Sequence, residues 1–292
     1  MKIGVIGLGN MGLAMALRLR ELGHALLVRD LLPQREALAQ AAGAEVAPNP
    51  AHMRAACSLV IVAVVDAAQC KDVLWGESGL AQPTGLDLDV MLCPTIAPAD
   101  VEHIAATLQS QGLGCIDAPM SGGPARVRSG CMSLMVACQE HLYLRHLGVL
   151  QHLASRLFHI SARAGDGART KLVNNLLAAV NLAAASEALA LATQLGLDAT
   201  RTQEVIAASS GSSWIGSDRM PRALAGDLAA RAHTILLAKD CALAVDMAAT
   251  CGFNPFLGRV AAQQFRAACA AGFGELDDAS LFNWAVQSRA TL

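Results

Sequence analysis

The sequence predicts an α/β protein in which a doubly wound sheet is followed by an all-α domain, with a long interdomain helix joining the two. Three observations predict it: glycines follow the first apolar run, β-rich runs alternate with helical runs through the first half, and the second half contains only long helical runs. Such alternation is typical of a parallel sheet covered by helices. We expect the sheet domain to cover residues 1–162 and the helical domain residues 163–292.

The first element is an apolar strand over residues 2–6 that leads into the motif Gly7-Leu8-Gly9-Asn10-Met11-Gly12. A helical stretch over 11–22 and a second strand over 25–28 follow, and the latter ends near Asp30. This order predicts a Rossmann unit that binds a dinucleotide. Gly7 permits the turn, Gly9 lets a pyrophosphate approach the backbone, and Gly12 lets the helix pack on the strand. The free N–H groups of the helix start would face the phosphates.

Asp30 predicts which dinucleotide binds. It lies about 20 residues beyond the motif, where a carboxylate accepts hydrogen bonds from the ribose hydroxyls and repels a 2′-phosphate. Residues 31–33 supply no arginine for such a phosphate, and Arg29 and Arg35 are the nearby candidates. We therefore expect NAD rather than NADP. The alternative is a glycine turn that binds nothing, but such a turn has no need of the distal acid.

The elements that follow in the first half continue the alternation. After a helix over residues 34–42, the apolar run 58–65 predicts a fully buried parallel strand. We expect Val64 and Val65, at the end of that run, to contact the cofactor. Further strands are expected at residues 90–93, 114–116, 133–137 and 157–160, and helices at 98–111 and 141–153.

Beyond residues 161–165, where we place the domain boundary, alanine and leucine dominate and β-branched runs are absent. Helices are expected at 168–195, 199–209, 233–250, 254–269 and 278–287. The stretch 172–195 is the most apolar of the chain. Its polar residues exceed what a membrane span tolerates, so we predict a long buried helix. They are Asn174, Asn175, Asn181, Ser186, Glu187 and Gln194.

Composition excludes several classes of function. The formal net charge of −2 gives no reason to expect nucleic acid or an anionic membrane surface as a partner. The nine cysteines are scattered and include no C-x-x-C pair, which predicts reduced thiols in a cytoplasmic protein. The eight histidines lack metal-ligand spacing, so we expect no metal, and the chain does not begin with a signal-peptide pattern.

Two polar segments follow predicted strands, where ligands bind in sheets of this kind. Thr95 could hydrogen-bond a nicotinamide or its ribose, although a helix N-cap is the simpler interpretation. Ser121, Gly122 and Gly123 offer a hydroxyl and unobstructed backbone N–H groups, which could hold a carboxylate. An ordinary turn is an equally good interpretation of that second segment.

Two further clusters lie on predicted helices. Lys171 and Asn175 are four residues apart and share one face of an apolar helix. A buried lysine has a lowered pKa and can exchange a proton near neutrality, whereas the alternative is a lysine that extends to solvent. Lys239 and Asp240 lie within another apolar helix, where a solvated pair is the alternative to a role in a site.

Taken together, these motifs resemble those of the β-hydroxyacid dehydrogenase family, which includes 3-hydroxyisobutyrate dehydrogenases, and the resemblance covers essentially the whole chain. It implies that Lys171 is the catalytic acid/base and that Asn175 supports it. It implies that Ser121, Gly122 and Gly123 hold the substrate carboxylate and that Thr95 lies on the nicotinamide side. Lys239 would close over the cofactor and substrate, with Asp240 beside it. The helical domain would form a homodimer or homotetramer.

The resemblance implies NAD-dependent hydride transfer to and from a small 3-hydroxy acid, such as 3-hydroxyisobutyrate, glycerate, L-serine or a sugar acid. The chain departs from the family pattern around the substrate loop: Pro94 replaces a serine, Arg126-Val127 a Gly-Ala, and Ala137-Cys138 a Gly-Gly. These departures concern the substrate more than the chemistry, and a solvated Arg126 is the simpler interpretation. The alternatives are a non-catalytic NAD-binding scaffold and an imine reductase, and Lys171 argues against both.

Overall fold

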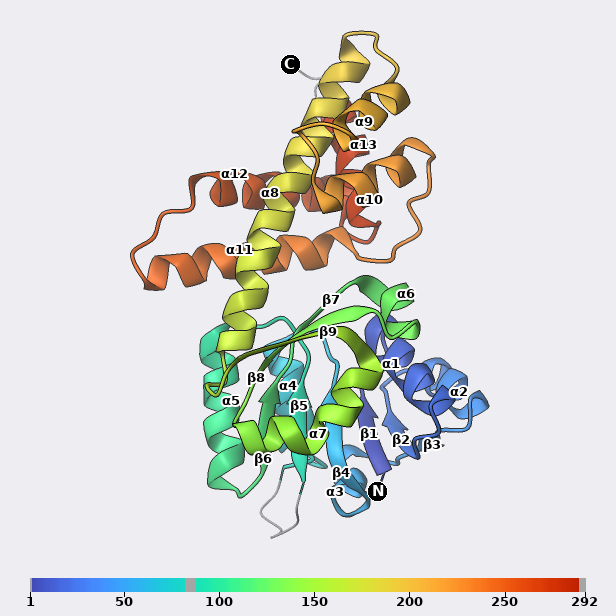
Figure 1. The fold of residues 1–292 in the computed structure, drawn as a ribbon, viewed down its shortest axis with the longest axis vertical. Helices are drawn as coiled ribbons and strands as arrows, with labels where there is room; N and C mark the ends of the chain where they lie inside the picture. Colours follow the sequence, from blue (N-terminus) through green and yellow to red (C-terminus); the bar gives the residue numbers. More distant parts are fainter. Residues whose placement is uncertain (1, 82–87, 289–292) are drawn as a thin grey trace. The chain divides into compact units, whose positions relative to one another are not determined.

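The computed structural model describes residues 2–81 and 88–288. Residue contacts divide the chain into two compact units, Met1–Lys171 and Leu172–Leu292. The division falls inside one continuous helix, α8 (Asp166–Gln194), nine residues beyond the boundary between residues 162 and 163 expected from the sequence. Each unit is described by itself below (Figure 1).

The first unit is built on one mixed sheet. Its strands are β1 (Lys2–Ile6), β2 (Leu26–Arg29), β3 (Glu45–Val46), β4 (Cys57–Val62), β5 (Asp89–Leu92), β6 (Gly114–Asp117), β7 (Met120–Ser121), β8 (Met132–Ala137) and β9 (Ala154–Ser161). The spatial order is β3-β2-β1-β4-β5-β6-β8-β7, and β9 pairs with β8. The strands from β3 to β6 are parallel, whereas β8 runs antiparallel to β6 and β7. The chain order reverses between β1 and β4, which is where a doubly wound sheet binds its ligand.

Helices cover both faces of this sheet. They are α1 (Asn10–Glu21), α2 (Pro33–Ala41), α3 (Pro50–Ala56), α4 (Ala67–Trp75), α5 (Pro98–Ser110), α6 (Gly123–Arg128) and α7 (Glu140–Leu153). Side chains alternate between the faces along each strand, so one strand supplies two cores. Val5 and Ile61 belong to the hydrophobic cluster beneath α1 and α7, whereas Val60 and Val62 belong to the cluster beneath α4 and α5. Burial on both faces explains the nearly continuous apolar runs.

The doubly wound fold predicted from the sequence is confirmed, with three local corrections in this unit. The strand expected over 58–65 ends at Val62: the Ala63 N–H makes the last hydrogen bond to β1, at the Ile6 carbonyl, and the chain then turns into α4, which Asp66 caps. Two short helices, α3 and α4, and the two-residue strand β3 were not expected. The segment expected as a loop around residues 121–123 instead joins strand β7 to helix α6.

The second unit is entirely helical, as predicted. Beyond α8 it contains α9 (Ala199–Ala207), α10 (Trp214–Leu224), α11 (Thr234–Thr250), α12 (Phe256–Ala268), η1 (Cys269–Phe273), η2 (Asp278–Ser280) and α13 (Leu281–Ser288). Its core gathers around Phe265, Leu182 and Met220, all fully buried. Helix α10 was not expected; it begins where the Ser213 side chain accepts a hydrogen bond from the Gly216 N–H.

Helix α8 is long and apolar enough, by length and composition, to cross a membrane. The buried helix predicted over 172–195 is only partly buried in the structure. Leu172 is buried and Leu182 and Leu189 lie in the core of the helical unit, whereas Val173, Leu177 and Leu191 are exposed. Its buried polar residues, Lys171 and Asn175, also fit a core helix better than a lipid-facing one.

Candidate active site

The glycine motif forms the turn between β1 and α1, and each glycine meets a different constraint. Gly7 has a φ of +88°, and a Cβ there would lie 2.7 Å from the Ala63 carbonyl oxygen. A Cβ on Gly12 would lie 1.8 Å from the Gly7 carbonyl oxygen. A Cβ on Gly9, in contrast, would meet no atom within 4 Å. Gly7 and Gly12 are therefore required by the fold, whereas Gly9 leaves open space beside the start of α1, which fits a pyrophosphate.

Asp30 lies at the end of β2 and faces this turn. Its carboxylate accepts a hydrogen bond from the Leu8 N–H, and a second one, of 2.8 Å, from the Leu32 N–H. The neighbouring Arg29 forms a 2.8 Å ion pair with Glu36, whose carboxylate also accepts a hydrogen bond from the Asp30 N–H. The acid expected to bind the ribose thus lies beside the glycine turn, and the guanidinium of Arg29 is paired with Glu36.

The residues predicted after β4 and β5 fall into loops at the same edge of the sheet. A Cβ on Gly7 would lie 3.1 Å from the Val64 side chain, so Val64 adjoins the glycine turn. Val65 is half-exposed, and its N–H donates to the Gln69 side chain. Thr95 is partly buried, and the N-cap of the following helix is Ala97. The alternative interpretation of Thr95 as a helix cap is therefore wrong.

Ser121, Gly122 and Gly123 lie where β7 passes into α6. Ser121 pairs with Ser133 of β8, and both glycines have positive φ, +134° and +73°. The stem of Arg126 covers Gly122, because a Cβ there would lie 3.0 Å from the Arg126 Cδ. This backbone is not an ordinary β-turn, and only glycine adopts the Gly122 conformation readily.

The start of α8 is held by Asp117, the last residue of β6. Its Oδ2 accepts hydrogen bonds from the N–H groups of Gly165, at 2.8 Å, and Ala168, at 3.1 Å. Burial raises the pKa of the Asp117 carboxyl to about 6, although hydrogen bonds from Gly165, Gly167 and Ala168 lower it. The sequence alone did not assign a role to Asp117. The sequence does contain a signal for such a role. An acid at the end of a predicted strand can accept hydrogen bonds from the free N–H groups at the start of a long helix, and such a helix begins at a glycine later in the chain.

Lys171 lies one turn further along α8 and is only 8% exposed, as is Asn175. The side chain of Lys171 is therefore buried rather than extended into solvent. Asn175 is held from two sides: its Nδ2 donates to the Asp240 Oδ2 over 2.7 Å, and its Oδ1 accepts from the Asn174 side chain over 3.0 Å. Two polar side chains with restricted freedom thus follow one another on one face of α8.

Lys239 and Asp240 lie on α11 and form an ion pair, with 3.2 Å between Nζ and Oδ1. Asp240 is buried, at 8% exposed, and it also binds Asn175. The pair is therefore more than the solvated pair considered as an alternative. Contacts of Lys239 and Asp240 with a cofactor or substrate stay predictions.

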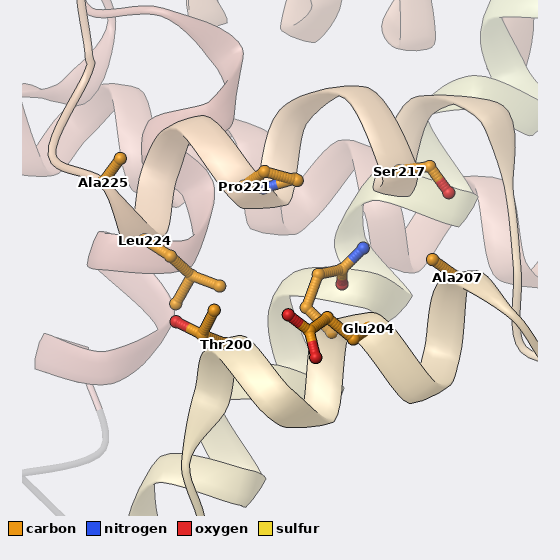
Figure 2. A pocket seen from close by; sticks show the side chains of 8 residues that line it. Thr200, Glu204, Ala207, Ser217, Pro221, Leu224 and Ala225 are labelled. Atoms are coloured by element: carbon orange, nitrogen blue, oxygen red, sulfur yellow. The ribbon is translucent and has the colours of Figure 1, made fainter.

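A separate pocket of about 350 Å³ lies between α9 and α10 of the helical unit (Figure 2). Thr200 and Glu204 line it from α9, and Ser217, Pro221 and Leu224 line it from α10. None of the predicted site residues borders it. In the part of the chain that the structure describes, no group of three or more His, Cys, Asp or Glu side chains is placed to bind a metal.

Comparisons with known proteins agree with this arrangement. A family model described as the NAD binding domain of 6-phosphogluconate dehydrogenase matches residues 2–161. One described as NAD-binding of NADP-dependent 3-hydroxyisobutyrate dehydrogenase matches residues 165–285. An L-threonate dehydrogenase of Cupriavidus necator is 36% identical over 96% of this chain and 94% of its own length. The human mitochondrial 3-hydroxyisobutyrate dehydrogenase is 30% identical over 97% of this chain and 86% of its own.

Among solved structures, a 3-hydroxyisobutyrate dehydrogenase from Salmonella typhimurium superposes with a TM-score of 0.90 at 33% sequence identity. The match covers 97% of this chain and 99% of that one. The similarity therefore extends over both units rather than over the dinucleotide-binding half alone.

Proposed function

Because the chain belongs to the β-hydroxyacid dehydrogenase family, we propose that it oxidises a small 3-hydroxy acid reversibly with NAD, using Lys171 as the general acid/base. The observation that carries this proposal is the burial of Lys171, 8% exposed, one turn from the equally buried Asn175 on α8. A buried amine loses part of its preference for the charged form, as proton exchange near neutrality requires.

In this mechanism the bound nicotinamide supplies the hydride chemistry. The chain's own residues place the substrate and move one proton. As the carbinol C–H bond breaks, the neutral Nζ of Lys171 accepts the hydroxyl proton, and in reduction the protonated Nζ returns it to the oxygen. Asn175 lies one turn beyond Lys171, and its amide, which is fixed by a hydrogen bond to Asp240, orients the Lys171 amine or the substrate. Ser121, Gly122 and Gly123 bind the substrate carboxylate through the hydroxyl and backbone N–H groups.

Replacing Lys171 tests this mechanism. We expect Lys171→Ala to lower kcat by at least about 10²-fold, the lower bound for general acid/base help, while the Kd for NAD stays nearly unchanged. Lys71→Ala is the matched control, because Lys71 forms a half-exposed ion pair with Asp100 and belongs to no predicted site. Full turnover in Lys171→Ala refutes the proposed role. A protein that binds NAD but oxidises none of the acids tested is instead a non-catalytic scaffold.

NAD is proposed as the preferred cofactor. The support is Asp30, which accepts the Leu8 N–H of the glycine turn, and the pairing of Arg29 with Glu36. A carboxylate in that place favours ribose hydroxyls and repels a 2′-phosphate. We expect kcat/KM to be higher with NAD than with NADP. Asp30→Ala should reduce the ratio of the kcat/KM with NAD to the kcat/KM with NADP. A strong preference of the wild-type enzyme for NADP would contradict the assignment.

The substrate is proposed as a small hydroxy acid of the kind that names the relatives, with L-threonate and 3-hydroxyisobutyrate as the first to test. A screen of NAD reduction across these acids, glycerate and L-serine, run with Lys171→Ala, identifies the substrate. Turnover of an imine but of no hydroxy acid would favour the imine reductase alternative.

We further propose a cytoplasmic homo-oligomer, either a dimer or a tetramer, with no nucleic acid or membrane partner. The nine cysteines, all free, suit a reducing compartment. Large apolar side chains on α12 are exposed, with Phe256 at 76% and Leu257 at 71%, and such surfaces usually meet a partner. Light scattering coupled to size exclusion measures the mass. A monomer at micromolar concentration contradicts the proposal.

A further inference from the structure

Asp117 is a buried carboxylate that the mechanism above does not use. It ends β6, pairs with Leu92 of β5 and Ala137 of β8, and is 1% exposed. An ionised carboxylate in such surroundings is costly unless hydrogen bonds compensate it. Its compensating donors lie in a segment far along the chain, at the start of α8.

Those donors are backbone N–H groups that a helix start leaves without partners. Oδ2 of Asp117 accepts from Gly165 over 2.8 Å and from Ala168 over 3.1 Å, and the Gly167 N–H contributes as well. The carboxylate also faces the positive end of the helix dipole, which makes the interaction stronger than one between neutral groups. Asp117 therefore sets the distance between the end of β6 and the first turn of α8.

Gly167 fixes the rotation of the helix. A Cβ on Gly167 would lie 2.7 Å from the Met135 carbonyl oxygen and 2.9 Å from the Asp117 Oδ2. The bare glycine face of α8 therefore rests directly on the ends of β6 and β8. Gly167 and Lys171 are four residues apart, so they share one face of the helix, about 6 Å apart along its axis. Any rotation or lift at Gly167 moves Lys171 as well.

We infer that Asp117 is a positioning residue: by holding the start of α8 against the sheet, it places the amine of Lys171 relative to the strand ends. This inference rests on the proposed function of Lys171. The segment that begins with Asp117 continues, within a few residues, to Ser121 and Gly122, which are proposed to bind the substrate carboxylate. One short segment therefore anchors the acid/base and carries the carboxylate-binding residues.

The test is Asp117→Asn, which keeps the shape and one acceptor but loses the charge. A displacement of about 1 Å at a catalytic group costs about 10²-fold. We expect kcat to fall by about 10- to 100-fold, with the KM and Kd for NAD within about twofold of wild type, since the hydrogen bonds of the Asp117 carboxylate go to the start of α8 and not to the glycine turn. The primary deuterium isotope effect on kcat, measured with substrate deuterated at the carbinol carbon, should rise as the chemical step becomes limiting.

Two further variants make the outcome specific. Gly167→Ala keeps the Asp117 carboxylate in the chain, but its Cβ would press on the Met135 carbonyl oxygen and the Asp117 Oδ2 and push the helix start off the sheet. We expect it to reproduce the loss of kcat. Asp166→Asn is the control: Asp166 is at the same helix start, but it pairs with Arg163 and Arg169 on the exposed side. Its kcat should stay within about twofold of wild type. If Asp117→Asn fails to fold, Gly167→Ala carries the same comparison.

The results separate this inference from the one on which it rests. A fully active Lys171→Ala overturns the proposed function. If Lys171→Ala is inactive but Asp117→Asn and Gly167→Ala have wild-type kcat per folded molecule, Asp117 is a structural cap and the positioning role is refuted. A stability loss without a change of kcat has the same meaning. A fall in kcat in Lys171→Ala, Asp117→Asn and Gly167→Ala, with Asp166→Asn unchanged, supports the positioning role.

Discussion

Alanine substitution at Gly9 and at Gly12 should separate the two tasks of the glycine motif. The Cβ of Gly12→Ala would lie 1.8 Å from the Gly7 carbonyl oxygen, whereas real Cβ contacts essentially never fall below 3.0 Å, so α1 must shift by 3.0 − 1.8 = 1.2 Å or more. The obstructing atom belongs to the backbone and cannot rotate away. Overpacking of this severity lowers the free energy of unfolding by about 3 kcal/mol, the upper end of the usual range. The better helix propensity of alanine offsets about 1 kcal/mol of that loss.

We therefore expect Gly12→Ala to lower the free energy of unfolding of the first unit by about 2 kcal/mol. Gly9→Ala should lower it by no more than about 1 kcal/mol, the cost of replacing the N-cap of α1 by alanine, which is a poorer cap than glycine. The Gly9 backbone, with φ −60° and ψ −171°, is open to alanine, and no atom lies within 4 Å of its Cβ position. Its methyl group would instead stand where a pyrophosphate approaches, so the affinity for NAD should fall about 10-fold or more.

Urea denaturation gives the free energy of unfolding, and fluorescence titration gives the Kd for NAD. We expect opposite results for the two variants. Gly12→Ala should lose more stability, whereas Gly9→Ala should stay close to the wild-type stability but bind NAD weakly. Wild-type stability in Gly12→Ala would show that α1 moves freely on the sheet. Wild-type affinity in Gly9→Ala would show that the dinucleotide does not pass over Gly9, and either result refutes the corresponding role.

Further predictions concern buried charges in the first unit. Because the pKa of Asp117 is raised from 3.8 to about 6, the folded protein binds that proton more tightly than the unfolded chain does. This contribution to stability therefore grows as the pH falls from about 7 to about 4, by about 2–3 kcal/mol, and it is absent in Asp117→Asn. A wild-type-minus-variant difference in unfolding free energy that is constant across this range contradicts the pKa. Asp89→Ala should cost about 2–4 kcal/mol, because it leaves His146, bonded at 2.6 Å, buried without its partner. Lys71→Ala, which breaks an exposed pair, should change stability by less than about 1 kcal/mol in the same urea measurement, and equal effects of the two substitutions would contradict the role of burial.

Most of the fold followed from local patterns. Apolar runs at the spacing of buried strands predicted β1, β2, β4, β5, β6, β8 and β9, and the long alanine-rich runs predicted α8 and α11. Of the elements that were not expected, the strands β3 and β7 have only two residues each, and the helices α3, α4 and α10 begin at side-chain caps, which are local signals rather than periodicity. Helix α3, for example, follows Asn49, whose side chain accepts the His52 N–H, with Pro50 at the first helical position.

The candidate site divides in the same way. The sequence pointed to Gly7, Gly12 and Asp30, because each acts within one βαβ unit where spacing along the chain determines spacing in the fold. It could not assign a role to Asp117, whose partners Gly165 and Ala168 are 48 and 51 residues away and meet it only because β6 ends beneath the start of α8.

The sequence by itself therefore determined the fold class and the dinucleotide turn, since these depend on periodicity and backbone freedom, whereas the residues of the proposed chemistry came from the resemblance to a family and stay predictions. Only the tertiary structure decided that Lys171 and Asn175 are buried, that Asp240 holds Asn175, and that Asp117 holds the helix that carries Lys171. Burial and long-range hydrogen bonds depend on which helices and strands pack against each other, and local sequence patterns do not reveal contacts between elements that are far apart in the chain.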